Sequence, residues 1–189
     1  MTYSPLLENK ENPHIMIKMF TTQLTGLFQR ISGKQEFEIE DSSRLLAQAA
    51  IGEGTIYIQA FGEMEGVAAE AISGAEPLPS AARYHENAEL TEADRVLIVT
   101  RFSTDEEAVT FARGLAEKGI PSVGISGLMS GDESLEEICD FHVDTKVIKG
   151  LLPGEEIGER VSFPSSMAAL YIYFALSFLI KEILSEYEE

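Results

Sequence analysis

The feature that most constrains the fold is an alternation of short, apolar, strand-like segments with helical segments between residues 55 and 147. The two clearest strand-like segments, TIYIQAF and RVLIVT, are almost continuously apolar, which is typical of strands buried on both faces of a parallel sheet. This order predicts an α/β fold, a three-layer α/β/α sandwich with a doubly wound central parallel sheet of about five strands. The strands are expected at residues 55–61, 81–82, 95–100, 121–126 and 141–147.

We expect a single domain over residues 12–189, preceded by a flexible N-terminal arm over residues 1–11. Asn12 is expected to cap the first helix, with Pro13 at its first position, and Gly33 to end it. Loops are expected over 34–40 and 150–158. The other helices are expected from Asp41 or Ser42 to Gly52, over 63–73, from Ser103 or Thr104 to Gly119, over 132–138, and from Pro164 onward.

Charge and composition limit the partners of the chain. It carries 32 acidic and 14 basic residues, a formal net charge of −18. Such a surface repels polyphosphates, so nucleic acids and anionic membranes are disfavoured, and a small anionic ligand needs a locally positive pocket. The chain starts without a secretory signal pattern, its longest apolar run has 14 residues, too short to span a bilayer, and Cys139 is its only cysteine. We therefore expect a cytoplasmic protein.

The terminal helix is apolar on nearly every side from Met167 to Ile180. A helix of this kind is buried on more than one face, so it either threads the core or packs against a second subunit. A chain of 189 residues seldom hides a whole helix. We therefore expect a homodimer, in which this helix and the first long helix contribute to the interface.

The expected ligand site lies at the carboxyl ends of the strands, where parallel α/β sheets bind their ligands. The segment that joins the strand at 95–100 to the next helix offers hydroxyls, backbone N–H groups and the positive charge of Arg101 to an anion. The alternative is that Ser103 or Thr104 only caps the helix, with a following glutamate completing a capping box. The expected ligand-binding residues are Gly62, Thr100, Arg101, Ser103, Thr104 and Ser126.

Three residues are candidate catalytic acids or bases. Glu63 and Glu65 follow a strand, and His85 lies in a loop-like stretch between strands. The alternatives are that the two glutamates complement a helix dipole and that His85 is a surface residue. No two histidines have metal-ligand spacing, and the spacing Gly62-x-x-x-Gly66 is not a dinucleotide fingerprint, so neither a metal nor a cofactor is expected.

From about Asp41 to Glu182 the order of elements resembles the sugar isomerase (SIS) domain, a phosphosugar-binding α/β/α fold. The segment GTIYIQAFG (54–62) is similar to its first strand and glycine turn, and DRVLIVT (94–100) to its next clear strand. The segment CDFHV (139–143) is similar to the start of its last strand, and the long apolar terminal helix also fits. The overall pattern is most similar to a small, uncharacterised SIS-like family of Gram-positive bacteria.

The resemblance implies a protein that binds a phosphosugar or another carbohydrate derivative, either an aldose–ketose sugar-phosphate isomerase or a non-catalytic sensor or scaffold. The phosphate loop of the family usually reads Ser-x-Ser-Gly-x-Thr/Ser. In this chain the matching positions hold Thr100, Phe102, Ser103 and Asp105, so a ring replaces one hydroxyl and a carboxylate another. We predict that Arg101→Ala weakens anion binding and that Asp105→Ser strengthens it.

Overall fold

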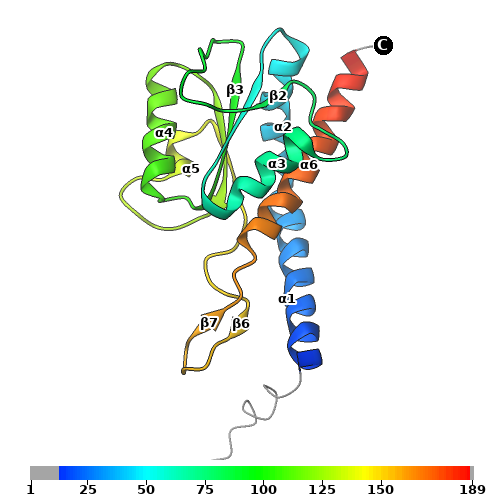
Figure 1. Ribbon diagram of the computed structural model, residues 1–189, viewed down its shortest axis with the longest axis vertical. Coiled ribbons are helices and arrows are strands. Elements are labelled where there is room, and N and C mark those ends of the chain that lie inside the picture. Colours follow the sequence, from blue (N-terminus) through cyan, green and yellow to red (C-terminus); the bar gives the residue numbers. More distant parts are fainter. Residues whose placement is uncertain (1–12, 188–189) are drawn as a thin grey trace, which may run out of the picture.

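A five-stranded parallel sheet forms the centre of the protein, as the alternation of segments predicts. The computed structural model describes residues 13–187 (Figure 1), so the expected arm over residues 1–11 and the cap at Asn12 lie outside the described residues. The spatial order of the strands is β2-β1-β3-β4-β5. Their bounds are β1 (Ile56–Ala60), β2 (Ala81–Arg83), β3 (Arg95–Phe102), β4 (Ser122–Gly127) and β5 (Phe141–Asp144).

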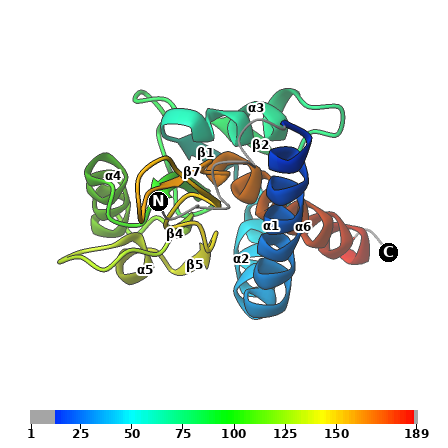
Figure 2. The same ribbon diagram turned by 90° about the horizontal axis from the view of Figure 1, so that it is seen from below.

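Helices cover both faces of this sheet, which confirms the three-layer sandwich. Figure 2 shows α4 and α5 on one side of the strands and α1, α2 and α6 on the other. The larger core joins the second group and α3 to the sheet, and the smaller core lies beneath α4 and α5. The helices are α1 (Pro13–Lys34), α2 (Glu36–Ile51), α3 (Glu65–Ser73), α4 (Glu106–Glu117), α5 (Leu135–Ile138) and α6 (Ser165–Tyr187).

The expected loop over residues 34–40 is wrong, because α1 and α2 are separated by a single residue, Gln35. Its φ of −125° interrupts the helix, and Glu36 and Glu38 then stand in the first turn of α2. Acidic side chains at this position favour a helix start. Ile39, which the sequence analysis placed in the loop, is 6% exposed and belongs to the larger core. Its burial fixes the start of α2 earlier than local sequence signals suggest.

Two further boundaries differ from the sequence-based expectations. The expected loop over 150–158 overlaps a small antiparallel hairpin of β6 (Leu152–Pro153) and β7 (Arg160–Val161), whose strands are too short to give an alternating pattern. The segment after Phe61 begins with a 3-10 turn, Gly62–Met64, before α3 starts. Figure 1 shows the hairpin beside the part of α1 that extends beyond the sheet.

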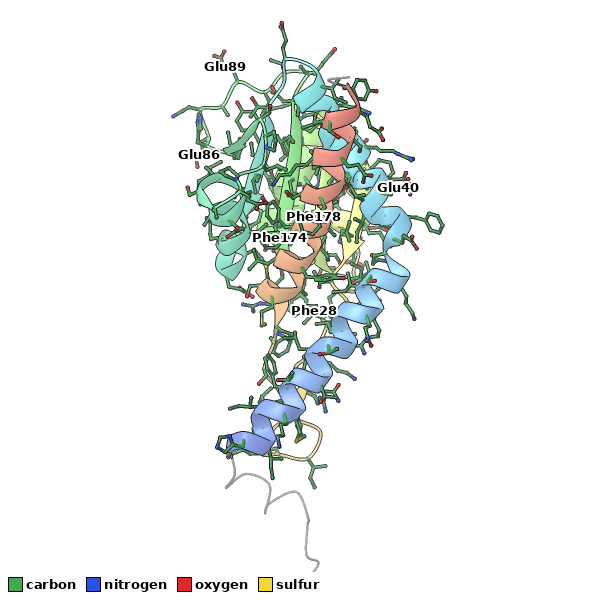
Figure 3. All side chains as sticks on the ribbon, turned by 90° about the vertical axis from the view of Figure 1, so that its right-hand side faces the viewer. Phe28, Glu40, Glu86, Glu89, Phe174 and Phe178 are labelled. Carbon is green, nitrogen blue, oxygen red and sulfur yellow. The ribbon has the colours of Figure 1, made fainter. Side chains whose placement is uncertain are left out.

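The terminal helix α6 has one face in the core and another in solvent. Its buried residues include Ile172, Tyr173 and Ile180, whereas Phe174 is 40% and Phe178 62% exposed. Figure 3 shows both phenylalanine rings on the face of α6 that points away from the sheet. By length and composition alone this 23-residue helix could cross a membrane, which the 14-residue apolar run did not suggest. In this fold, however, its buried face packs against α2, α3 and the sheet.

Candidate functional site

A pocket lies at the carboxyl ends of β1 and β3, the two strands between which the strand order reverses. In the strand order β2-β1-β3-β4-β5 the connections from β1 and β3 leave toward opposite faces, and ligands of doubly wound folds bind at this switch point. The chain turns sharply after β1 at Gly62, whose φ of +57° strongly favours glycine. The pocket has a volume of about 300 Å³.

Four of the nine sequence-predicted site residues line this pocket, namely Gly62, Glu63, Thr100 and Arg101. The other five, Glu65, His85, Ser103, Thr104 and Ser126, are not part of its lining. The complete lining consists of Phe61, Gly62, Glu63, Thr100, Arg101, Asp105, Glu106, Glu107 and Ala108. Arg101 is the only basic residue among these, so the pocket carries one positive charge among four acidic side chains.

Arg101 and Glu63 form a two-pronged ion pair across the pocket. The Nε of Arg101 donates to Oε1 of Glu63 at 2.6 Å, and a terminal guanidinium nitrogen donates to Oε2 at 2.8 Å. The two side chains are 50% and 38% exposed. The hydrogen bond from Arg101 lowers the pKa of Glu63 and raises that of Arg101, so both groups are charged at neutral pH. The sequence analysis placed both residues at the site but did not foresee that they bind each other.

Asp105 turns back toward the end of β3. Its Oδ2 accepts hydrogen bonds from the Thr100 hydroxyl at 2.6 Å and from the Phe102 backbone N–H at 3.0 Å. These are donors that an anion bound at this loop could otherwise use. Because Asp105 also closes the turn, Asp105→Asn is the conservative variant to set beside Asp105→Ser, whose predicted gain in anion binding stays a prediction.

The expected caps of the helix after β3 are wrong. Asp105 is the N-cap residue of α4, and its side chain makes no hydrogen bond to the first turn. The Ser103 hydroxyl instead accepts a hydrogen bond from the Met129 N–H and donates one to the Met129 carbonyl, while Thr104 lies against Gly131. The loop after β4 therefore draws both hydroxyl residues away from the pocket. Without a side-chain cap, the first turn of α4 presents its backbone N–H groups to the pocket.

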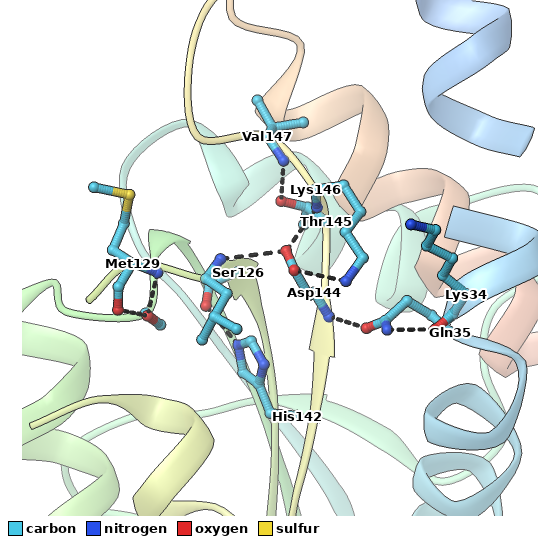
Figure 4. A network of polar contacts seen from close by, with 11 residues as sticks. Lys34, Gln35, Ser126, Met129, His142, Asp144, Thr145, Lys146 and Val147 are labelled. Atoms are coloured by element: carbon cyan, nitrogen blue, oxygen red, sulfur yellow. Dashed lines mark hydrogen bonds and ion pairs between the residues drawn. The ribbon is translucent and has the colours of Figure 1, made fainter. Parts of the chain in front are cut away.

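Ser126 belongs to a separate polar cluster at the ends of β4 and β5 (Figure 4). Its hydroxyl lies 2.7 Å from Nε2 of the buried His142. Asp144 accepts hydrogen bonds from the Lys146 side chain and from the Leu128 and Lys146 N–H groups. The sequence analysis missed Asp144 because it extended the last strand to Val147, whereas β5 ends at Asp144. An acidic residue at the carboxyl end of a strand is the signal that a correct boundary would have revealed.

The two remaining acid–base candidates lie away from the pocket. Glu65 forms an ion pair with Arg83 of β2. His85 is exposed in the loop after β2 and accepts a hydrogen bond from the Ala88 N–H through its backbone carbonyl. Within residues 13–187, no group of three or more histidine, cysteine, aspartate or glutamate side chains is placed to hold a metal ion.

The sheet order, the two helical layers and the pocket at the switch point define a protein with the sugar isomerase fold. One similar solved structure is the sugar isomerase domain of an RpiR transcription factor from Sphaerobacter thermophilus, at 15% identity and a TM-score of 0.56 over 91% of this chain and 90% of that one. Another is a protein of E. coli CFT073 in complex with A5P, at 14% identity and a TM-score of 0.64 over 98% of this chain and 94% of that one. At this identity the likeness shows the fold alone.

The chain belongs to the family described as "Domain of unknown function (DUF2529)", whose model matches residues 16–184. A relative of Bacillus subtilis (strain 168), "Uncharacterized protein YwjG", is 47% identical over 173 residues, which cover 91% of this chain and 99% of the relative. Together these findings confirm the expected SIS-like fold and the expected likeness to an uncharacterised family of Gram-positive bacteria.

Proposed function

We propose that this protein binds a sugar phosphate in the pocket between the ends of β1 and β3. The observation that carries the proposal is the meeting of the Arg101 guanidinium and the uncapped first turn of α4 at the switch point of the sheet. Both features favour an anion, and a positive side chain is rare in a chain of net charge −18. The similar E. coli structure with the sugar phosphate A5P supports the choice of ligand class.

Binding without catalysis fits the pocket better than isomerisation. An aldose–ketose isomerase needs a base that can take a proton from the sugar, and Glu63 is the only predicted acid–base candidate in the lining. Its carboxylate is held by Arg101, which lowers its pKa and makes it a weaker base. A non-catalytic sensor or scaffold module is therefore the form of the proposal that we favour. Sugar-phosphate isomerisation is the second candidate, favoured by the place of Glu63 in the pocket.

A thermal-shift screen tests the proposal. A ligand present at one hundred times its Kd stabilises the native state by about 2.7 kcal/mol, which raises the Tm of a domain of this size by roughly 5–10 °C. We expect one or more sugar phosphates to produce such a shift, the matching unphosphorylated sugars to produce none, and Arg101→Ala to abolish it. Equal shifts with phosphorylated and unphosphorylated sugars, or an unchanged shift in Arg101→Ala, would contradict the proposal.

We further propose that a second copy of this chain covers the exposed apolar surface of α1 and α6. Ile17, Phe163 and Met167 are 62%, 49% and 42% exposed, and they line a mainly apolar groove of about 420 Å³ between α1, the β6–β7 hairpin and α6. Phe174 and Phe178 continue the apolar surface along α6 (Figure 3). An apolar surface of this extent is typical of an interface. We also propose that the dimer is cytoplasmic and has neither a nucleic-acid nor a membrane partner, because a chain of net charge −18 repels polyphosphates and anionic membranes.

Phe178→Glu is expected to convert the dimer to a monomer at micromolar concentration, because it sets a charge into an apolar interface. Sedimentation velocity measures the change. Phe37→Glu is the matched control, since Phe37 is 75% exposed on α2, outside the proposed interface, and its replacement should leave the dimer intact. A wild-type protein that sediments as a monomer at these concentrations would refute the proposed dimer.

A further inference from the structure

Arg101 is already occupied by an anion that belongs to the chain itself. Both oxygens of the Glu63 carboxylate accept hydrogen bonds from the Arg101 guanidinium, at 2.6 and 2.8 Å. This two-pronged arrangement is the one by which arginine binds a carboxylate or a phosphate of a ligand. A ligand anion can therefore bind the edge of Arg101 formed by Nε and this terminal nitrogen only by taking the place of Glu63.

We propose that Glu63 sets the anion selectivity of the pocket by competing with the ligand for Arg101, so that phosphate groups bind and simple carboxylates do not. This inference rests on the proposed function and deepens it. It assigns to Glu63 the role of a specificity-determining residue, whether or not the protein also catalyses a reaction.

The competition excludes carboxylates because Glu63 is tethered. A side chain that is held beside its partner acts at an effective concentration of roughly millimolar or more, so a free carboxylate of equal intrinsic strength is outcompeted at ordinary concentrations. A phosphate monoester differs in kind, since it carries a charge of about −1.5 to −2 and three acceptor oxygens. Its additional oxygens can accept hydrogen bonds from the N–H groups at the start of α4 while it binds Arg101.

The exposure of the pair allows the exchange. The Arg101 and Glu63 side chains are 50% and 38% exposed, and exposed ion pairs are weak because water solvates the separated charges well. Glu63 also stands in a short 3-10 turn directly after Gly62, at the open mouth of the pocket. Its carboxylate can therefore leave Arg101 for solvent without exposing any part of the core.

Asp105, the other carboxylate at the end of β3, is not exchangeable in this way. It accepts hydrogen bonds from the Thr100 hydroxyl and the Phe102 N–H, and Thr100 is only 1% exposed. Removing Asp105 would leave buried donors without a partner. The phosphate group is therefore expected on the Arg101 side of the pocket, and the selectivity is expected to depend on Glu63.

Titration of the protein with inorganic phosphate and with acetate, followed by the NMR shifts of the backbone amides, tests the proposal. We expect the wild-type protein to bind phosphate and not acetate. In Glu63→Gln, which keeps the shape but removes the competing charge, we expect phosphate to bind about 3–10 times more tightly and acetate binding to become measurable. Arg101→Ala should bind neither anion.

Glu65→Gln is the matched control, because Glu65 lies two residues further on and pairs with Arg83 outside the pocket. It should behave as the wild type does. If the wild type binds phosphate but Glu63→Gln binds it no more tightly and still rejects acetate, the competition is refuted while the proposed function stands. If no variant binds phosphate, the proposed function fails, and the inference fails with it.

Discussion

Replacing Asp144 with alanine is expected to lower the free energy of unfolding by about 3 kcal/mol, because one partner of a largely buried ion pair is removed. Asp144 is 9% exposed and accepts three hydrogen bonds at the ends of β4 and β5. Two of its donors are backbone N–H groups, of Leu128 and Lys146, and the third is the Lys146 ammonium group at 2.8 Å (Figure 4). Alanine offers an acceptor to none of them.

Urea denaturation at neutral pH measures this loss as a lower midpoint at an unchanged slope. Asp132→Ala is the control, because Asp132 is exposed in the loop after β4 and its replacement should change the stability by less than about 0.5 kcal/mol. An equal, small effect of the two substitutions would show that the cluster around Asp144 does not hold the strand ends together.

The second large effect concerns acid. Burial lowers the pKa of His142 from 6.5 to about 4, and the nearby Asp144 opposes this shift only in part. Unfolded His142 therefore binds a proton at a higher pH than folded His142 does. Between pH 6.5 and 4 the unfolded state binds more protons, so stability present above pH 6.5 is lost as the pH falls through this range. We expect this one residue to account for a loss of about 3 kcal/mol.

Protonation of carboxylates also lowers the stability of a folded protein in acid, so the measurement compares two proteins. His142→Gln has no titrating side chain and keeps a group that can hydrogen bond with the Ser126 hydroxyl, which lies 2.7 Å from His142. Its unfolding free energy, measured by urea denaturation from pH 7.5 to pH 4, should fall less steeply than that of the wild type. Identical pH dependence in the two proteins would mean that His142 is not held neutral in the core.

The sheet could be predicted from the sequence because its strands are buried on both faces. Residues 55–61 and 95–100 are almost continuously apolar. β1 lies within the first range, and β3 covers the second and extends two residues beyond it. The break between α1 and α2 could not be predicted in the same way. Gln35 and the polar residues after it favour a loop locally, and only the burial of Ile39 against the core shows that the helix resumes at Glu36.

For the candidate site, the sequence predicted where the pocket lies but not how its side chains pair with one another. The rule that ligands bind beyond the carboxyl ends of parallel strands was sufficient to place Gly62, Glu63, Thr100 and Arg101 around one pocket. The sequence did not reveal the pairing of Arg101 with Glu63, because the two residues are 38 positions apart and their contact depends on side-chain orientation.

The expected role of Ser103 as the cap of α4 was wrong for a related reason. Its hydroxyl faces Met129, in a loop whose course depends on the packing of β4 and α5. A serine before a helix usually caps it, and here the loop after β4 provides a competing partner. Residue type and spacing thus identified the pocket, whereas the direction of each hydroxyl required the tertiary structure.

A crystal structure of the protein with a bound sugar phosphate, selected by the thermal-shift screen, tests the central claim most directly. Our account predicts that the phosphate lies in the pocket between β1 and β3, with its oxygens within hydrogen-bond distance of the Arg101 guanidinium and the first N–H groups of α4. It also predicts that Glu63 no longer contacts Arg101. A phosphate bound elsewhere, for example beside Lys146 at the end of β5, or bound with the Arg101–Glu63 pair intact, would contradict the account.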